Sequence, residues 1–567
     1  MNKILIILLI FCTTVSSGQK HYFSPPVKIP ILLSGNFAEL RSNHFHSGID
    51  IKTQGVSGIP VYAAADGYIS RIAVSPTGYG NALYINHPNG TTTVYGHLQS
   101  FKKDIAEFVK ESQYQQKSFR VNLQVPAGKF EVKKGEMIAK SGNSGSSGGP
   151  HLHFEIRNTE TENPQNPLKY NFDIKDDRPP KVLSLLIAPL TDTSHINYET
   201  RKRRYPIVFY DGKYHIKNNP AIPVWGEIGF AIETNDYLND SWSKCGIYSY
   251  QLTIDDELYF SNRLDEFSFA ETRYINSLID YETYIKLNRR FQKTWVEPGN
   301  KLSTYDFVKE NGTFKVTGTG VHKIKIELKD TYGNSSVLEF KVAGKPKKIL
   351  KPEPAFTKTF YYNSHNSYKT DDFQLEIPKG ALYSNLKFTY STIPVLSGNY
   401  SKIYKIHKNT VPLHTAVLVK IKTKNLPTEL EQKALLVVID DKTGKYWAAN
   451  GTFENGWVTS EIKLFGTYTV KVDTVPPTIK PLSIQSKKTL TEATQIRFKV
   501  SDDLAGIKTI EGFLDGKWAL FEYDAKRKLI THKFDKKRFD FNQEHLLQLT
   551  VTDYRNNQSK YEATFWK

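Results

Sequence analysis

The chain has 567 residues, which excludes a single hydrophobic core and predicts roughly three to five domains. Its hydrophobic content of 39% is sufficient for globular folding. The formal net charge of +18 favours acidic partners. A generally basic solvated surface explains that charge equally well, because the lysines are spread along the chain and do not form one patch.

The first residues, MNKILIILLIFCTTVSSGQK, predict a secretory signal peptide over residues 1–18. Lys3 gives a positive start, Ile4–Phe11 form a short apolar core, and Ser16–Gly18 offer small residues for cleavage. The apolar run is too short for a transmembrane anchor. Cys12 does not indicate a lipoprotein, because the bulky Phe11 stands where a small residue should precede a lipidated cysteine. We expect export to the periplasm or cell envelope, or beyond the cell, with the envelope rather than nucleic acid as the polyanionic partner.

After removal of the signal peptide, Cys245 is the one remaining cysteine. A single cysteine cannot form an internal disulfide, so the exported chain must be held together by its cores. Its surroundings, SWSKCGIYS, are typical of a turn that enters a strand, so we do not expect a catalytic cysteine.

Residues 19–172 are expected to form a small antiparallel β domain with its core at 33–168. The stretch IPVYAAADGYISRIAVS predicts two strands around Asp66–Gly67, and NALYINHPNGTTTVYGHL predicts a hairpin that turns at Pro88–Gly90. KKGEMIAKSG predicts a further strand. Residues 102–116 are the one helical candidate, because Ile105, Phe108 and Val109 share a face.

The remainder predicts an all-β chain of several β-sandwich modules. Two copies of one pattern, at 176–345 and 473–567, open with DDRPPKV and DTVPPTI and close with IKIELKDTYGNSSVLEFKV and LQLTVTDYRNNQSKYEATF. They resemble bacterial immunoglobulin-like modules, and the first carries an insertion around residues 263–311. A β-rich module at 350–472 lies between them. Its LEIPKGAL resembles a small β module of the ZU type.

Histidines and one aspartate of the first β domain predict a zinc site. In the strand HLHFEI, His151 and His153 point to one face, with Leu152 behind them. Upstream, His46 precedes Asp50 by four residues and His97 ends the strand YGHL. A catalytic zinc takes three His or Asp ligands and leaves the fourth position for water, whose pKa it lowers toward ~7. Two histidines are then left over, and these suit proton handling and oxyanion stabilisation.

These motifs resemble the lysostaphin/LytM-type zinc metallopeptidases from Leu33 to Leu168. The matching stretches are NHFHSGIDI, GIPVYAAADGYI, GYGNALYINHPNGTTTVYGHL and KKGEMIAKSGNSGSSGGPHLHFEIR. The resemblance implies a compact antiparallel β fold with an open groove. It implies one Zn²⁺ per chain, with His46, Asp50 and His153 as ligands and His97 and His151 as the catalytic pair. The implied activity is cleavage of peptide cross-links or glycine bridges in peptidoglycan.

The sequence departs from the family pattern at two places. Residues 101–128 form an insertion that we expect to be either a wall of the groove or a lid that restrains activity. The extra His44 is expected to line the groove or face solvent and not to bind metal. Strand alternation places Glu155 on the face of His151 and His153, where we expect a structural hydrogen bond.

The main prediction is a secreted zinc endopeptidase in which zinc-bound water attacks a peptide bond of peptidoglycan. The alternative is a catalytically restrained or silent module that binds the cell wall or activates another protein. A structural adhesin would leave the five-residue constellation without a purpose. We expect residues 176–567 to hold the enzyme at the wall or to bind an envelope protein, and a chain ending near Lys169 to fold alone. Which peptide bond is cut stays open.

Overall fold

The computed structural model describes residues 22–170, 172–349 and 354–567, so the predicted signal peptide lies outside the described residues. Strands hold 47% of the chain and helices 7%, which confirms the all-β prediction. Over the described ranges, every helix is too short or too polar to cross a membrane.

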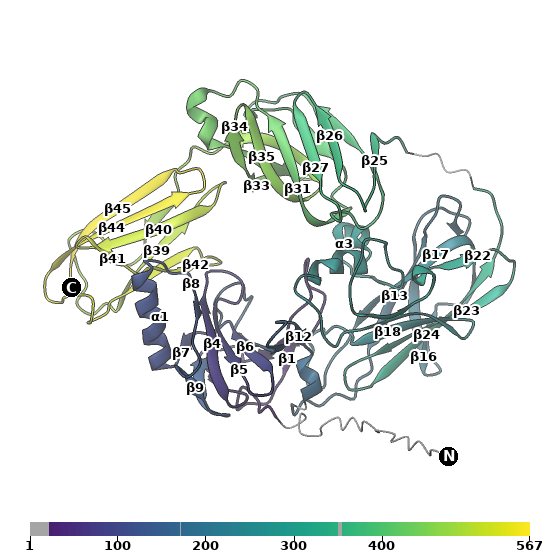
Figure 1. The fold of residues 1–567 in the computed structure, drawn as a ribbon, viewed down its shortest axis with the longest axis horizontal. Helices are drawn as coiled ribbons and strands as arrows, with labels where there is room; N and C mark the ends of the chain where they lie inside the picture. Colours follow the sequence, from purple (N-terminus) through teal and green to yellow (C-terminus); the bar gives the residue numbers. More distant parts are fainter. Residues whose placement is uncertain (1–21, 171, 350–353) are drawn as a thin grey trace, which may run out of the picture.

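Four domains follow one another around a ring (Figure 1). The N-terminal domain is followed by the first sandwich, then by a third domain and finally by the last sandwich. The last sandwich returns to the N-terminal domain beside helix α1 (Lys103–Gln115). Contacts across this closure include a 2.6 Å ion pair between Lys110 and Asp535 and an edge-on ring contact between Tyr114 and Trp518.

The N-terminal domain is built on a nine-stranded sheet of order β1-β2-β11-β6-β5-β4-β8, with β12 beside β11 and β9 beside β4. Its strands are β1 (Leu33–Gly35), β2 (Ile49–Lys52), β4 (Gly67–Val74), β5 (Asn81–Asn86), β6 (Thr91–Gly96), β8 (Val121–Gln124), β9 (Glu131–Val132), β11 (His151–Asn158) and β12 (Pro164–Gln165). A smaller sheet joins β3 (Pro60–Tyr62), β10 (Met137–Lys140) and β7 (Ser100–Phe101).

The predicted helix forms as α1, one residue shorter at each end than expected. It buries Ile105 and Val109 against the main core, as the i, i+4 spacing requires. The hairpin β5–β6 turns where Gly90 adopts a φ of 79°, a conformation that glycine takes without steric cost. Strands β7 and β8 flank the helix, so the insertion is part of the domain's packing.

One long strand of the first sandwich takes part in both layers of strands. In β17 (Ala221–Asn235), the first half pairs with β24 (Ser335–Gly344) and the second half with β13 (Lys181–Pro189). The neighbouring strands β18 (Ser249–Ile254) and β23 (Val321–Lys329) complete the face that β24 begins. The predicted insertion contains the short helices α2 (Ile275–Leu278) and α3 (Tyr281–Leu287).

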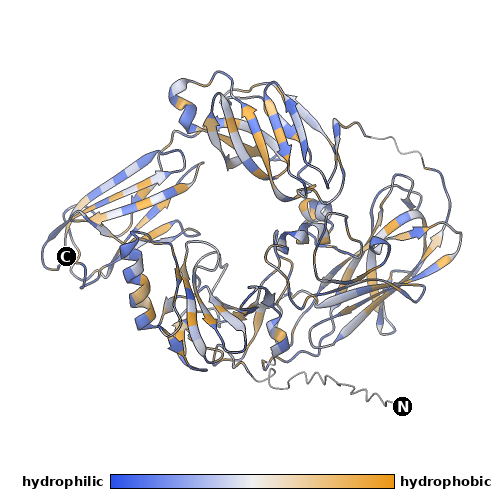
Figure 2. Ribbon diagram, viewed as in Figure 1, coloured by the Kyte–Doolittle hydropathy of each residue, from blue (hydrophilic) through white to orange (hydrophobic). Residues whose placement is uncertain are grey.

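The third domain and the last sandwich show the strand alternation that the sequence predicts (Figure 2). The third domain has two five-stranded sheets, centred on β31 (Pro412–Lys422) with β35 (Trp457–Leu464), and on β32 (Ala434–Ile439) with β36 (Gly466–Val472). The last sandwich pairs β37 (Thr478–Pro481) with β39 (Gln495–Ser501), and β44 (Glu544–Asp553) with β40 (Ile507–Leu514) and β45 (Gln558–Trp566).

The cores of the first two domains cross their sequence boundary. Phe37 and Phe45, from the loop that precedes His46, are buried in the core of the first sandwich, and each ring lies 5.3 Å from that of Phe267. In return, Leu238 and Cys245 of the sandwich belong to the core of the N-terminal domain. The burial of Phe37 and Phe45 therefore depends on the first sandwich, which counts against the expectation that residues up to Lys169 fold alone. That expectation stays a prediction.

Candidate metal centre

Two neighbouring antiparallel strands bring the predicted metal ligands together. In the register of β2 with β11, Asp50 lies directly opposite His153. The alternation of β11 puts His151, His153 and Glu155 on one face, while Leu152 and Phe154 are fully buried on the other. His46 approaches from the loop before β2.

One donor atom from each predicted ligand meets the other two. His46 Nε2 lies 3.0 Å from Asp50 Oδ1 and 3.1 Å from His153 Nδ1, and the last two atoms are 2.9 Å apart. A tetrahedral zinc site with bonds of about 2.0–2.1 Å needs donors roughly 3.3 Å apart. Two imidazoles and one carboxylate at nearly this spacing fit zinc in number, type and position.

Hydrogen bonds on the far side of each ligand fix its metal-binding atom. The Nδ1 of His46 lies 2.7 Å from the carbonyl oxygen of Asn36, so Nδ1 carries the proton and Nε2 offers its lone pair. The Nε2 of His153 lies 2.7 Å from Glu155 Oε1, which leaves Nδ1 for the metal. Arg41 donates to the second oxygen of Asp50 at 3.0 Å. These hydrogen bonds therefore orient the metal-binding atom of each ligand toward the other two.

Glu155 organises a buried network behind His153. Its carboxylate also accepts hydrogen bonds from Ser47, Tyr79 and Arg157. Burial alone would raise the pKa of Glu155, but Arg157 and His153 outweigh it and hold that pKa well below its usual range. The carboxylate therefore stays ionised and orients the histidine, which is the structural role expected from strand alternation.

The charges at the centre favour proton binding when no metal is bound. Burial alone would lower the pKa of His153, but hydrogen bonds to Asp50 and Glu155 outweigh it and raise that pKa to about 9. Burial opposes ionisation of Asp50, yet the three histidines around it hold its pKa well below the usual value. A metal ion would therefore replace a proton on His153.

We expect the affinity for zinc to rise by about tenfold per pH unit between about pH 7 and 8.5, because a proton on His153 competes with the metal below its pKa of about 9. The dissociation constant measured with a competing zinc indicator across this range tests the slope. Calorimetry in buffers of different ionisation enthalpy should show His153 releasing about one proton per zinc. An affinity that does not change with pH would contradict the assignment of His153 as a ligand.

The two remaining histidines stand beside the ligands, and each is held through its Nδ1 atom. His97 Nδ1 lies 2.9 Å from the carbonyl oxygen of Ser144, and His151 Nδ1 lies 2.9 Å from that of Gly149. Their rings are 4.8 Å apart, and His151 Nε2 lies 3.4 Å from Asp50 Oδ1. His97 adopts a φ of 59°, a left-handed conformation that costs a non-glycine residue energy and recurs at functional sites.

Burial, strengthened by repulsion from His153 and His151, lowers the pKa of His97 to about 3. The imidazole is therefore neutral at any physiological pH. With Nδ1 committed to Ser144, its Nε2 is a proton acceptor.

The structure brings the five predicted residues into one centre, while their catalytic roles stay predictions. His44 lies outside the cluster, and its Nδ1 donates to the carbonyl oxygen of Ser42. Sequence reasoning missed Asn36 and Arg41, which orient His46 and Asp50. No spacing rule connects them to the motifs, because the loop that carries them is shaped by the first sandwich.

Residues of the first sandwich support that loop directly. The side chain of Asn36 donates to the carbonyl oxygen of Gly246 at 2.7 Å and accepts from the amide of the same residue at 2.8 Å. Thr272 accepts a 2.9 Å hydrogen bond from the amide of Phe45. The orientation of His46 thus depends on a domain that begins more than a hundred residues later in the chain.

The last sandwich contacts the glycine-rich loop of residues 142–149, which lies on the other side of the centre. Lys526 Nζ donates to the side-chain oxygen of Asn143 at 2.7 Å and to the carbonyl oxygen of Ser147 at 2.9 Å. This loop supplies the carbonyl groups of Ser144 and Gly149 that hold His97 and His151. A pocket of about 580 Å³ lies beside it, between the N-terminal domain and the last sandwich.

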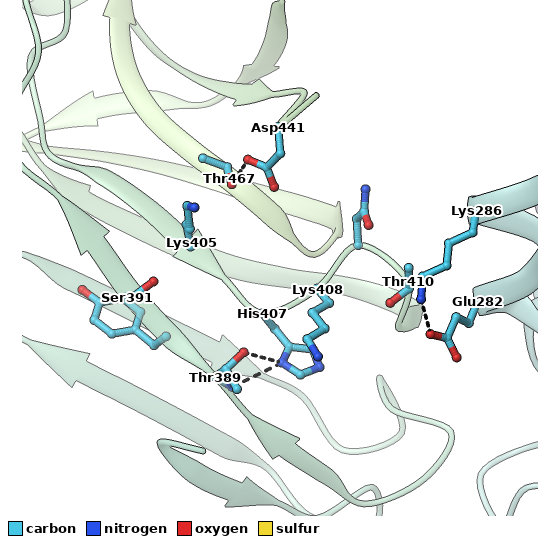
Figure 3. Close-up of a pocket in the computed structure, with 12 residues that line it drawn as sticks. Glu282, Lys286, Thr389, Ser391, Lys405, His407, Lys408, Thr410, Asp441 and Thr467 are labelled. Carbon is cyan, nitrogen blue, oxygen red and sulfur yellow. Dashed lines mark hydrogen bonds and ion pairs between the residues drawn. The ribbon is translucent and has the colours of Figure 1, made fainter. Parts of the chain in front are cut away.

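A second pocket of about 580 Å³ lies between helix α3 and the third domain (Figure 3). His407 faces it, but its Nδ1 accepts hydrogen bonds from Thr389, and Lys286 pairs with Glu282. Its lining contains no group of metal-binding side chains.

Comparison with known proteins identifies two regions of the chain. The model of peptidase family M23 matches residues 44–115 and 119–167, and that of the Zu5-like domain matches residues 357–473.

A DD-carboxypeptidase/endopeptidase Mpg of Neisseria meningitidis is 37% identical over 22% of this chain and 23% of its own length. The peptidoglycan DD-endopeptidase ShyA of Vibrio cholerae is 30% identical over 30% of this chain and 35% of its own length. The catalytic domain of lysostaphin from Staphylococcus simulans is 23% identical, covers 24% of this chain and 88% of that domain, and has a TM-score of 0.18.

The chain therefore spans between about a fifth and a third of the length of these two curated relatives. The matched region is the one that carries His46, Asp50, His97, His151 and His153. The predicted resemblance to the lysostaphin/LytM-type peptidases is confirmed: the N-terminal domain of this chain matches peptidase family M23 over residues 44–115 and 119–167.

Proposed function

We propose that the chain is an exported zinc endopeptidase that hydrolyses peptide cross-links of peptidoglycan. The observation that carries the proposal is the meeting of three donor atoms, His46 Nε2, Asp50 Oδ1 and His153 Nδ1, each with its far side already hydrogen-bonded. The name of the Vibrio relative, a peptidoglycan DD-endopeptidase, supports the substrate class, and that of the Neisseria relative supports endopeptidase activity.

The chain's own residues supply proton handling beside the ligands. The neutral His97 can accept a proton from the attacking water at Nε2 and later return it to the leaving amine. His151, whose Nδ1 proton is bound by the carbonyl oxygen of Gly149, can direct an Nε2 proton toward the developing oxyanion when its ring carries a second proton. A zinc ion held by His46, Asp50 and His153 would polarise the scissile carbonyl and lower the pKa of water to about 7.

We expect alanine at His97 or His151 to leave zinc binding intact and to lower turnover by roughly a hundredfold or more, the scale of general acid–base and oxyanion help. Zinc content by elemental analysis and kcat on a soluble cross-linked peptide measure the two effects separately. Loss of zinc from the His151→Ala variant, with zinc retained in His153→Ala, would reverse the roles assigned within this pair.

Incubation of the full-length, zinc-loaded protein with purified peptidoglycan tests the proposal. Mass analysis of the released muropeptides should show fragments cut at a peptide bond, and the fragment masses would identify that bond. Glycan-chain cuts without peptide cuts would contradict it.

A restrained or silent peptidase is the second candidate function, and the contact of Lys526 with the loop at Asn143 and Ser147 favours it. In this alternative the last sandwich holds the catalytic loop until a partner at the cell wall displaces it. The same muropeptide assay separates the two candidates, because a restrained enzyme with full zinc content releases no fragments.

We further propose that the protein acts in the periplasm or at the cell envelope. The signal-peptide pattern of residues 1–18 and the net charge of +18 support this location. The modules after residue 176 would bind the wall or an envelope protein.

A further inference from the structure

Each sandwich contains three aspartates whose carboxylates converge. In the first sandwich they are Asp176, Asp236 and Asp330, and one oxygen of each lies within 4.8 Å of the others. In the last sandwich Asp473, Asp502 and Asp553 form a second group, in which one oxygen of each again lies within 4.8 Å of the others. Neither group takes part in the chemistry proposed for the M23 domain.

The two groups occupy corresponding places in the repeated pattern. The first aspartate opens each module in a D-x-x-P-P sequence, at Asp176 and Asp473. The second follows β17 or β39 directly, at Asp236 and Asp502. The third stands at the end of the strand that pairs with the closing strand, as Asp330 after β23 and as Asp553 in β44.

The third aspartate is held in the same way in both modules. In the first sandwich, Asn334 donates to Asp330 Oδ2 at 2.7 Å and to the carbonyl oxygen of Asp176 at 3.0 Å. In the last sandwich, Asn557 donates to Asp553 Oδ2 at 2.7 Å and to the carbonyl oxygen of Asp473 at 2.9 Å. One asparagine in each module thus holds two of the three acidic residues in place.

Each group has one arginine nearby, Arg178 or Arg555, whose charge partly offsets that of the aspartates. The guanidinium of Arg555 donates to the carbonyl oxygens of Ala434 and Gly451. Asp236 is 3% exposed, and its Oδ1 is buried without a hydrogen-bond partner; the same atom of Asp502 is also without one. Arg178 lies near the first group, yet its Nη1 donates to the carbonyl oxygens of Leu238 and Ser241. A buried, unpaired carboxylate is costly, and buried charges in proteins are paired or bind metal.

The pKa values of the first group reflect the same unfavourable burial of negative charge. Burial, together with the charges of Asp176 and Asp330, raises the pKa of Asp236 to about 8. Burial and the nearby Asp330 also raise the pKa of Asp176. A proton or a cation between the carboxylates relieves this repulsion, and a divalent cation relieves all three at once.

We propose that each sandwich binds one Ca²⁺ ion through its three aspartates. All of the converging atoms are carboxylate oxygens, the ligands that hard cations prefer. Three carboxylates leave the bound ion with a net charge of −1, and backbone carbonyl groups or water can fill the remaining positions of the six to eight that Ca²⁺ takes. Mg²⁺ is disfavoured, because it demands near-ideal octahedral geometry and gives up its water reluctantly.

Both ions would lie at junctions between domains. Asp236 exchanges two backbone hydrogen bonds with Cys245, and the next residue, Gly246, is the one that holds Asn36 behind His46. In the last sandwich the backbone amide of Asp473 donates to the carbonyl oxygen of Lys433 of the third domain at 3.0 Å. Calcium would thus fix the orientation of adjacent domains relative to one another.

The test is a calcium titration of the zinc-loaded, full-length protein by calorimetry. We expect two Ca²⁺ ions per chain, with dissociation constants up to about 1 mM, as in extracellular modules. Asp236→Asn and Asp502→Asn should each remove one ion, and the double variant both. The matched controls are Asp177→Asn and Asp503→Asn, which change an exposed neighbour of a cluster residue and should still bind two.

Thermal unfolding distinguishes a lost site from a damaged fold. Without calcium, Asp236→Asn should unfold at the same temperature as the parent or above it, because one repelling charge is gone. With about 5 mM calcium, above the expected dissociation constants, the parent and the control variants should gain the most stability, each single variant only what its remaining site supplies, and the double variant none. Stoichiometry below two in the parent, an unchanged stoichiometry in the double variant, or Mg²⁺ binding as tight as Ca²⁺ binding would overturn the proposal.

Discussion

Replacing Asp50 with alanine is expected to remove zinc and peptidoglycan cleavage together. Its Oδ1 is the atom that both His46 Nε2 and His153 Nδ1 approach, so the variant leaves two imidazoles with no anionic ligand. It also leaves Arg41, which donates to Oδ2, with a positive charge directed at the empty position. Two histidines without an anionic ligand hold a dication weakly, although Arg41 keeps its ion pair with Glu39 at 3.2 Å. Alanine at His46 or His153 should likewise abolish metal binding.

Elemental analysis of the purified variant and the muropeptide assay measure the two losses. His44→Ala is the matched control, because it removes a histidine two residues from His46 whose side chain lies outside the donor group. The control should keep full zinc content and activity. Full zinc occupancy in the Asp50→Ala variant would overturn the ligand assignment.

A chain that ends after Lys169 is expected to be strongly destabilised and to bind zinc poorly. Truncation exposes Phe37 and Phe45, which are 3% and 1% exposed in the full chain. Burial of one such side chain contributes roughly 1.5–3 kcal/mol, so the two together account for a large part of the about 5–15 kcal/mol that stabilises a typical domain. The cut also removes Gly246, the partner that fixes Asn36 behind His46.

A chain that ends after Lys345 is the control for this truncation, since it keeps the first sandwich and both shared core clusters. Urea unfolding and zinc titration of the two truncated chains should show a large loss only in the shorter one. Second-shell changes cost about 10–100-fold in metal affinity, which sets the scale for zinc. Equal unfolding free energies in the two chains would show that the domain boundary at Lys169 is a real folding boundary.

The sequence predicts the local parts of the centre from strand alternation, and the resemblance to the lysostaphin/LytM-type peptidases supplies the full ligand set. The period of two places His151, His153 and Glu155 on one face of β11, and the tight loop before β2 brings His46 to Asp50. The helix at 103–115 and the hairpin at Gly90 follow from equally local rules. Where the geometry depends on neighbours within a few residues, pattern and structure agree.

What the sequence does not predict depends on contacts between distant segments. Asn36 orients His46, but its own partner is 210 positions further along the chain. Phe37 and Phe45 look like core residues of the first domain and instead fill the core of the second. Spacing rules carry no information about such pairs. The aspartate groups are an intermediate case, since the repeat places their members at corresponding positions but only the fold brings them together.

The closure of the ring has a thermodynamic consequence. The last sandwich and helix α1 belong to one chain, so their association is intramolecular and proceeds at an effective concentration far above that of two separate molecules. Contacts too weak to join independent proteins can therefore keep the ring closed. Several of these contacts are exposed ion pairs, such as Lys537 with Glu107, which contribute about 0.2–1 kcal/mol each and weaken as salt rises. The balance between open and closed rings is then set by ionic strength and by any polyanion that competes for the same lysines.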